Sequence, residues 1–114
     1  MLIALLSTGK GTWGHVSRLL ASYDTVHLLT NDFGAERFAP QEGVVLHTVL
    51  GGIEVELIKK RIIEALKPVL SSELEVDINL ASGSGIEHMA LIAALFELGV
   101  GFKIVYADEG VQVL

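Results

Sequence analysis

The chain has 114 residues, of which 51% are hydrophobic and 19% charged, and its formal net charge at pH 7 is −6. One domain of this length can bury a core without cross-links, and a sequence without cysteine excludes disulfide scaffolds and cysteine-rich zinc modules. No apolar run approaches the roughly 18 residues of a membrane span, and the acidic balance argues against long nucleic acids as partners. We therefore expect a single cytoplasmic domain over residues 1–114, bound neither to a membrane nor to a long nucleic acid.

Short apolar runs alternate with helical or irregular segments in the first half of the chain. A continuous apolar run is typical of a strand buried on both faces, whereas apolar residues spaced by three and four are typical of a helix. These patterns predict strands at 2–6, 25–30 and 44–50, a helix at 13–22 with Thr12 as its N-cap, and an irregular stretch at 33–43 with one helical turn before Pro40.

The second half of the chain has clearer boundaries. The patterns predict helices at 53–69 and 86–98 and strands at 76–81, 102–107 and 111–114. Pro68 is expected to end the first of these helices and Gly99 the second. The turn at 108–110 is too short for a crossover connection, so the last strand must run antiparallel to the strand before it.

The alternation of strands and helices predicts an α/β fold. Such a chain forms right-handed crossovers and a mostly parallel, Rossmann-like sheet with helices on both faces. Counted along the chain, the expected strand order is 3-2-1-4-5, with the antiparallel sixth strand on an edge. The winding direction then reverses between the first and fourth strands, and open α/β sheets bind ligands beyond the carboxyl ends of the strands at such a reversal.

The loop after the first strand is rich in glycine and lies in a segment with a net positive charge. Residues 1–23 contain two basic residues and no acid, so they carry +2 while the rest of the chain carries −8. Glycines let backbone N–H groups approach an anion, and the next helix adds a positive N-terminus. A Walker A loop is excluded because its upstream glycine is missing. The predicted ligand contacts in this segment are Thr8, Gly9, Lys10, Gly11, Thr12 and Arg18.

A second loop, after the fourth strand, is rich in serine and glycine. Ser84 and Glu87 have the spacing of a capping box, which predicts the start of a helix. The hydroxyls and N–H groups of this loop could hold a phosphate or a ribose, and the helix dipole favours a neutral imidazole at His88. The predicted ligand contacts here are Ser82, Gly83, Ser84, Gly85 and His88.

The four histidines differ in their expected roles. His15 lies close to the positive segment, where it could contact a phosphate or protonate a leaving oxygen. His27 and His47 fall inside predicted strands and are expected to be satisfied within the sheet. No spacing of His, Asp or Glu makes a metal site, so we expect neither a metal nor a cofactor.

Residues 78–86 and 89–95 resemble the strand, Ser/Thr-Gly-rich loop and Ala-rich helix of CARF domains, the CRISPR-associated Rossmann-fold sensors. The stretch Val105-Tyr106-Ala107-Asp108 is similar to the same pattern. The resemblance implies a homodimer that binds cyclic oligoadenylate across its two-fold axis in CRISPR-linked defence. It also implies either a sensor or a metal-independent ring nuclease, in which a ribose 2′-hydroxyl attacks the neighbouring phosphate.

Carried over by position, the resemblance places Ser82, Gly83 and Ser84 against the ligand, with the first glycine-rich loop opposite. The candidate catalytic residues are Lys10, His15 and Ser82. Gly85 stands where the family usually has lysine, which removes a charge that would bind phosphate and stabilise a transition state. Because the sequence to Leu114 holds no winged-helix or RNase domain, we expect a bare sensor or a stand-alone degrader.

Two other interpretations remain open. The spacing Gly9, Gly11 and Gly14 matches the Gly-x-Gly-x-x-Gly fingerprint of dinucleotide sites, and Asp32 stands where the ribose-binding acid is expected. Residues 11–18 are also similar to the first loop of GT-B glycosyltransferases, of which this chain could be an N-terminal half only. Alternatively, the apolar edge strand at 111–114 could pair with another chain in a non-catalytic oligomerisation module.

Overall fold

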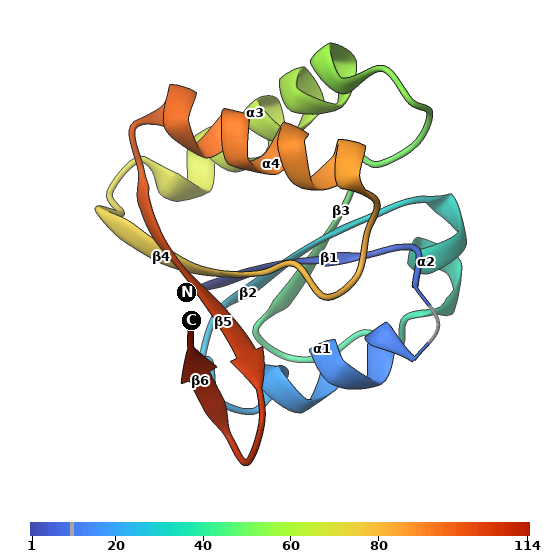
Figure 1. Ribbon diagram of the computed structural model, residues 1–114, viewed down its shortest axis with the longest axis vertical. Helices are drawn as coiled ribbons and strands as arrows, with labels where there is room; N and C mark the ends of the chain where they lie inside the picture. Colours follow the sequence, from blue (N-terminus) through green and yellow to red (C-terminus); the bar gives the residue numbers. More distant parts are fainter. Residues whose placement is uncertain (10) are drawn as a thin grey trace.

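A mixed sheet passes through the middle of the molecule, with helices on both of its faces (Figure 1). The computed structural model describes residues 1–9 and 11–114. Within them, the strands are β1 (Leu2–Leu6), β2 (Val26–Thr30), β3 (Val44–Thr48), β4 (Glu75–Asn79), β5 (Gly101–Ala107) and β6 (Val111–Val113). The helices are α1 (Thr12–Leu20), α2 (Asp32–Arg37), α3 (Val55–Leu70) and α4 (Gly85–Leu98).

The strand order is β3-β2-β1-β4-β5-β6, which confirms the predicted α/β fold and its topology. β1 pairs in parallel with both β2 and β4, and the outer pairs β2–β3 and β4–β5 are parallel too. β6 is antiparallel to β5. The winding direction therefore reverses between β1 and β4. Because these two strands run in the same direction, the loops that follow them leave the sheet at the same edge.

The sheet separates two apolar cores. All five residues of β1 are buried, because its alternate side chains enter opposite layers. Ile3 and Leu5 pack with α3 and α4, whereas Leu2, Ala4 and Leu6 pack with α1. The continuous apolar run that predicted this strand thus reflects burial on both faces, and it fixes the carboxyl end of β1 at the centre of the sheet.

The start of α1 differs from the prediction. Gly11, with a φ of 78°, is the N-cap, and Thr12 is the first residue of the helix. The Thr12 hydroxyl donates to the Gly9 carbonyl at 2.7 Å, so it is not the acceptor that an N-cap threonine would provide. A left-handed backbone conformation strongly favours glycine, and the cap residue is Gly11. The predicted cap was therefore one residue late.

Other element boundaries also differ from the predicted ranges by one or two residues, and α3 and α2 show why. Pro68 lies inside α3, which continues to Leu70, because a proline in the last turn removes one backbone bond while Leu70 is still buried in the core. The stretch predicted as irregular contains α2, whose N-cap Asn31 accepts from the Gly34 N–H at 2.9 Å. A helix of six residues is too short to show a hydrophobic period, so only its cap could have revealed it.

Across residues 1–9 and 11–114, none of the helices has both the length and the apolarity that a bilayer crossing requires.

Candidate functional site

The loops after β1 and β4 lie side by side and are hydrogen-bonded to each other. The Ser7 backbone N–H donates to Ser82 Oγ at 2.9 Å, and the Ser82 hydroxyl donates to the Thr8 carbonyl at 3.1 Å. The Gly83 N–H donates to the same carbonyl at 2.9 Å. These contacts join segments that are far apart in the sequence, at the point where the winding reverses.

Glu87 is hydrogen-bonded to both loops. Its carboxylate is only 7% exposed and accepts from the Ser7 hydroxyl at 2.7 Å and from the Ser84 N–H at 2.9 Å. Its own N–H donates to Ser84 Oγ at 3.2 Å, which completes the predicted capping box. The carboxylate therefore does more than cap α4, because it also holds the loop after β1. The sequence gives no signal for that second contact.

Gly83 packs closely against His88. Gly83 has a φ of +107°, and a Cβ at this position would lie 3.1 Å from His88 Nε2 and 3.3 Å from a Glu87 carboxylate oxygen. His88 Nε2 lies 2.9 Å from the Ser82 carbonyl, which can only accept, so this nitrogen carries a proton. The loop after β4 consequently requires glycine at 83 both for its backbone and for its packing.

The predicted contact residues divide into an inner and an outer set. Ser82 is 0% exposed, and its hydroxyl has a partner on each side. The N–H groups of Gly83 and Ser84 already have protein acceptors. The exposed members form what we call the rim of the two loops: Thr8, Gly9, Gly11, Ser84 and Gly85. A ligand can reach the rim without breaking the contacts that join the loops.

Two helices begin at this edge of the sheet. α1 starts at Thr12 directly after the loop of β1, and α4 starts at Gly85 directly after the loop of β4. A helix N-terminus carries a partial positive charge and N–H groups without intrahelical partners. The first turn of α1 has no acidic residue, and the one acid in the first turn of α4 is the inward-facing Glu87. Among the residues that the structure describes, the charges at the rim therefore favour an anion.

His15 connects α1 with two strands. Its Nε2 lies 3.2 Å from the Ala107 backbone N–H and 3.2 Å from Asn79 Nδ2. Both neighbours are donors, so Nε2 must accept and the ring proton lies on Nδ1. Asn79, only 2% exposed, also donates to the Val105 carbonyl at 2.8 Å. The sequence pointed to His15 and not to Asn79, because their pairing depends on the folded structure.

A cavity of about 320 Å³ adjoins this network at the carboxyl ends of β4 and β5. Its lining consists of His15, Asn79, Leu80, Ala81, Ile104, Val105, Tyr106 and Leu114. Most of these side chains are apolar, which is the usual character of a small-molecule pocket, and the volume lies at the lower end of the range for such pockets. No sequence pattern pointed to this cavity, whose walls come from four separate segments.

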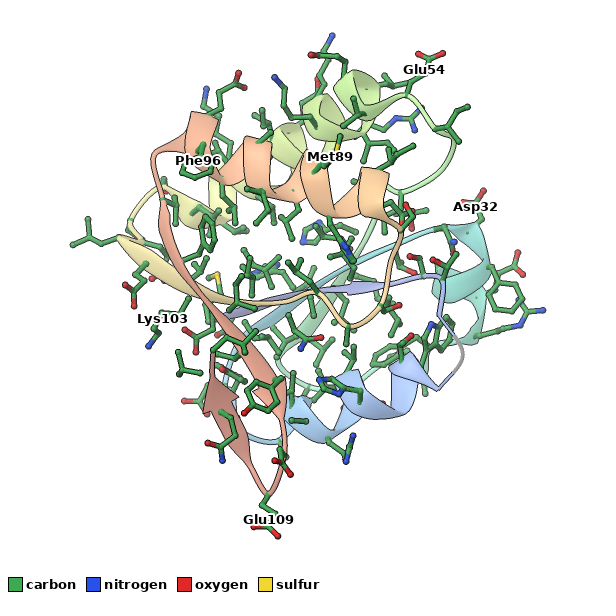
Figure 2. All side chains as sticks on the ribbon, viewed as in Figure 1. Asp32, Glu54, Met89, Phe96, Lys103 and Glu109 are labelled. Carbon is green, nitrogen blue, oxygen red and sulfur yellow. The ribbon has the colours of Figure 1, made fainter. Side chains whose placement is uncertain are left out.

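The remaining predicted residues lie elsewhere. Arg18 is exposed in the last turn of α1, roughly 9 Å along the helix from Thr12, so the loops do not bring it to the rim. Lys10 lies outside the described residues. Asp32 is the first residue of α2, two residues beyond the end of β2, and Figure 2 shows its side chain directed away from the molecule. Trp13 donates from Nε1 to the Ser7 carbonyl at 3.0 Å and thereby supports the loop.

His27 and His47 lie within the strands, as predicted, and they form a pair that the sequence did not predict. Nδ1 of His27 lies 2.9 Å from Nε2 of His47, and the two rings stack with centroids 5.1 Å apart. Burial lowers the pKa of both imidazoles below the ordinary 6.5, and the charge of His47 lowers the pKa of His27 further. The pair is therefore neutral at pH 7, and it lies inside the strands, apart from the rim.

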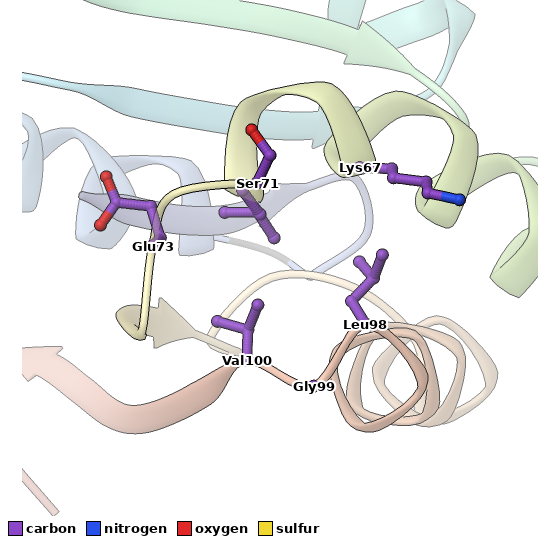
Figure 3. Close-up of a pocket in the computed structure, with 7 residues that line it drawn as sticks. Lys67, Ser71, Glu73, Leu98, Gly99 and Val100 are labelled. Carbon is purple, nitrogen blue, oxygen red and sulfur yellow. The ribbon is translucent and has the colours of Figure 1, made fainter.

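Another cavity, of about 350 Å³, lies where α3 and α4 end, at the opposite edge of the sheet from the rim (Figure 3). Its lining includes Lys67, Ser71 and Glu73 and none of the residues predicted to bind a ligand. Among the described residues, no three His, Asp or Glu side chains gather in a way that could hold a metal ion.

Comparison with known proteins identifies no family for this chain. No protein-family model matches the sequence, and no curated protein matches it significantly. The structure therefore establishes the fold, while the ligand is argued from the residues themselves.

Proposed function

We propose that the protein binds a nucleotide phosphodiester at the rim, with cyclic oligoadenylate as the leading candidate, and that it does so as a homodimer. The observation that carries this proposal is the joining of the two loops at the reversal point, with α1 and α4 both beginning there. Open α/β sheets bind their ligands at this position.

The charges around the rim support an anionic ligand. The N-termini of α1 and α4 provide partial positive charge and N–H groups that suit a phosphate. Glu87 would oppose an anion if it faced the rim, but its carboxylate is turned inward and accepts from Ser7 and Ser84. A phosphate at the exposed Ser84 and Gly85 therefore meets hydrogen-bond donors rather than a carboxylate.

The neighbouring cavity suits the base of the same ligand. Its apolar walls, including Leu80 and Ile104, are of the kind on which a planar ring packs, and His15 and Asn79 supply polar atoms at its border. A base in this cavity and a phosphate at the rim would use two features that lie beside each other in the fold.

Binding without cleavage is the outcome that the residues favour. Ser82 is buried with its hydroxyl engaged, and Gly85 brings no charge to the phosphate. His15 Nε2 already accepts from two donors, so only its Nδ1 could transfer a proton. We therefore propose a CARF-like sensor. Cleavage of the cyclic oligoadenylate would instead identify the protein as a ring nuclease.

Isothermal titration calorimetry with cyclic tetra- and hexaadenylate tests this function, with linear tetraadenylate as the matched control. We expect saturable binding of at least one ring at micromolar protein. Incubation of the same mixture, followed by chromatography of the nucleotides, separates a sensor from a nuclease. Absence of heat for both rings would overturn the proposal.

One observation favours a second candidate, a dinucleotide-binding domain. Asp32 lies two residues beyond the end of β2, where dinucleotide-binding folds place the acid that accepts from a ribose. Thermal unfolding with NAD and with UDP tests this candidate. Stabilisation by NAD that Asp32→Asn abolishes would replace cyclic oligoadenylate with a dinucleotide as the ligand. The leading proposal predicts no stabilisation by either compound.

A further inference from the structure

The Glu87 carboxylate uses only one of its two oxygens to hold the loops. Oε1 accepts from the Ser7 hydroxyl at 2.7 Å and from the Ser84 N–H at 2.9 Å. None of the residues that the structure describes donates to Oε2. The side chain is nevertheless buried, since Glu87 is only 7% exposed. Buried polar groups in folded proteins are normally hydrogen-bonded, so the second oxygen of this carboxylate is an unused acceptor.

Oε2 lies at the part of the carboxylate that a ligand can reach. In the described part of the chain, every fully buried polar side-chain atom has a hydrogen-bond partner, so Oε2 belongs to the small fraction of Glu87 that stays exposed. Two glycines leave space around the carboxylate. A Cβ at Gly83 would lie 3.3 Å from its Oε1, and a Cβ at Gly85 would meet nothing within 4 Å. The loop after β4 therefore keeps the carboxylate open to a small group.

Donors that suit a phosphate lie next to this acceptor. The N–H groups of Gly85 and Ile86 are the first two of α4, where a helix provides no acceptor of its own. Neither N–H finds another acceptor among the described residues. Glu87 follows directly and supplies Oε2. The first turn of α4 thus presents two donors and one acceptor on three consecutive residues.

A phosphate with a neighbouring hydroxyl matches this order of groups. Ionised phosphate oxygens accept from N–H groups, whereas a hydroxyl can donate to a carboxylate oxygen in a strong, charge-assisted bond. In a 3′,5′-linked ring of oligoadenylate, the 2′-hydroxyl is the free hydroxyl of each ribose, and it is adjacent to the phosphate on the 3′ oxygen. Placed between the two anions, the hydroxyl keeps the phosphate from meeting the carboxylate directly.

We propose that Glu87 Oε2 accepts a hydrogen bond from the ribose 2′-hydroxyl of the bound nucleotide, while the N–H groups of Gly85 and Ile86 hold the adjacent phosphate. Glu87 is then a specificity-determining residue that selects ribonucleotides over nucleotides without this donor. The inference rests on the proposed function and names the part of the ligand that the rim recognises. In a ring shared by two chains, each chain contacts one ribose through its own Glu87.

Glu87→Gln changes the outer atom of this side chain and keeps the inner one. Glutamine at the third position of a helix completes a capping box as glutamate does. Because the Ser84 N–H requires an acceptor, the amide oxygen takes the place of Oε1 and the amide nitrogen takes the place of Oε2. An amide N–H cannot accept from the 2′-hydroxyl, and the charge that strengthens the bond is removed as well.

Calorimetric titration of the unaltered protein tests the contact first. Cyclic tetra- and hexaadenylate are each compared with the 2′-fluoro analogue, which keeps the shape of the ribose but cannot donate. We expect the ribose ring that binds to do so at least about ten-fold more tightly than its analogue, because the analogue leaves the carboxylate oxygen unsatisfied. Equal affinities overturn this inference and leave the proposed function intact. Absence of heat for both ribose rings overturns the proposed function, and this inference with it.

The same titrations with Glu87→Gln assign the discrimination to this residue. We expect the ratio of the two affinities to fall to within about three-fold, because a neutral amide replaces the charged acceptor. Glu97→Gln is the matched control, since it removes the same charge from the same helix at an exposed side chain roughly 15 Å further along α4. It should keep the ratio of the unaltered protein. Urea unfolding confirms that both variants are folded. A ratio that Glu87→Gln leaves unchanged overturns the inference.

A divalent cation is the other group that a carboxylate oxygen beside a phosphate can hold. The titrations are therefore repeated with EDTA and with Mg²⁺. A hydroxyl on Oε2 predicts the same affinity and the same discrimination in both solutions. Binding that requires Mg²⁺ and is lost in Glu87→Gln places a cation on the carboxylate instead, and it overturns the inference while the nucleotide remains the ligand.

Discussion

The Ser82 hydroxyl oxygen lies 2.9 Å from the Ser7 backbone nitrogen and 3.1 Å from the Thr8 carbonyl oxygen. One side chain thus accepts from and donates to the loop of a different strand, 75 residues earlier in the sequence. The rim depends on this contact, because the loops after β1 and β4 are held in place by the groups that they exchange.

Substitution of Ser82 tests the contact between the loops. In Ser82→Ala, the Ser7 N–H loses its acceptor in a partly buried position, which costs about 1–3 kcal/mol of the free energy of unfolding. Urea unfolding measures this loss. Ser71→Ala is the control, because Ser71 is exposed and its hydroxyl lies 3.4 Å from its acceptor; we expect a change within about 0.5 kcal/mol. Equal stabilities of the two variants would contradict the role of Ser82.

Gly83 and Gly85 provide a matched pair of substitutions around the loop after β4. Gly83→Ala places a methyl group against His88 and Glu87 in a left-handed backbone, and we expect it to lower the free energy of unfolding by about 1–3 kcal/mol. Gly85→Ala meets nothing within 4 Å at the start of α4 and should be neutral or stabilising by up to about 1 kcal/mol. The loop geometry is wrong if alanine is tolerated better at 83 than at 85.

The tautomers of two histidines can be measured directly. The donors around His15 require its ring proton on Nδ1, while the carbonyl beside His88 requires a proton on Nε2. Long-range ¹⁵N–¹H correlation spectra at pH 7.5 distinguish these forms. A proton on Nε2 of His15 would mean that the contacts to Asn79 and Ala107 are not formed.

The paired histidines of the sheet predict a dependence of stability on pH. Burial lowers the pKa of His27 and His47 in the folded protein, so below about pH 6.5 the unfolded chain binds more protons than the folded one. The free energy of unfolding therefore falls as the pH decreases from about 6.5, by at most about 1.4 kcal/mol per pH unit for each histidine. Urea unfolding of the double variant His27→Gln/His47→Gln should show a flatter profile between about pH 6.5 and 5.5. An unchanged slope would show that other groups cause the pH dependence.

The sequence predicted the sheet well because its physical signals are local. The apolar runs of the strands and the spacing of apolar residues in the helices are continuous in the sequence, and their alternation led to the correct strand order. The capping box at Ser84 and the terminating role of Gly99 are local as well, and both are observed. Such patterns depend on neighbours within a few residues, which a single sequence reports directly.

The site was predicted less completely, because its contacts join distant segments. The pairing of His15 with Asn79 and the contact from Ser7 to Glu87 depend on the folded arrangement of the strands, and no local spacing encodes them. Ser82 was predicted to contact the ligand and to take part in catalysis, whereas its side chain is fully buried. Only one helical turn was predicted where α2 lies, because its six residues are too few to show a hydrophobic period.

The most direct test of ligand binding at the rim is a ¹H–¹⁵N correlation spectrum recorded during titration with cyclic tetraadenylate and, in parallel, with cyclic hexaadenylate. We expect at least one ring to shift the amide signals of Thr8, Gly9, Ser84 and Gly85, together with those around the cavity beside His15. Binding at the rim is contradicted if neither ring shifts these signals, or if the shifts occur instead at the opposite edge of the sheet around Ser71 and Val100.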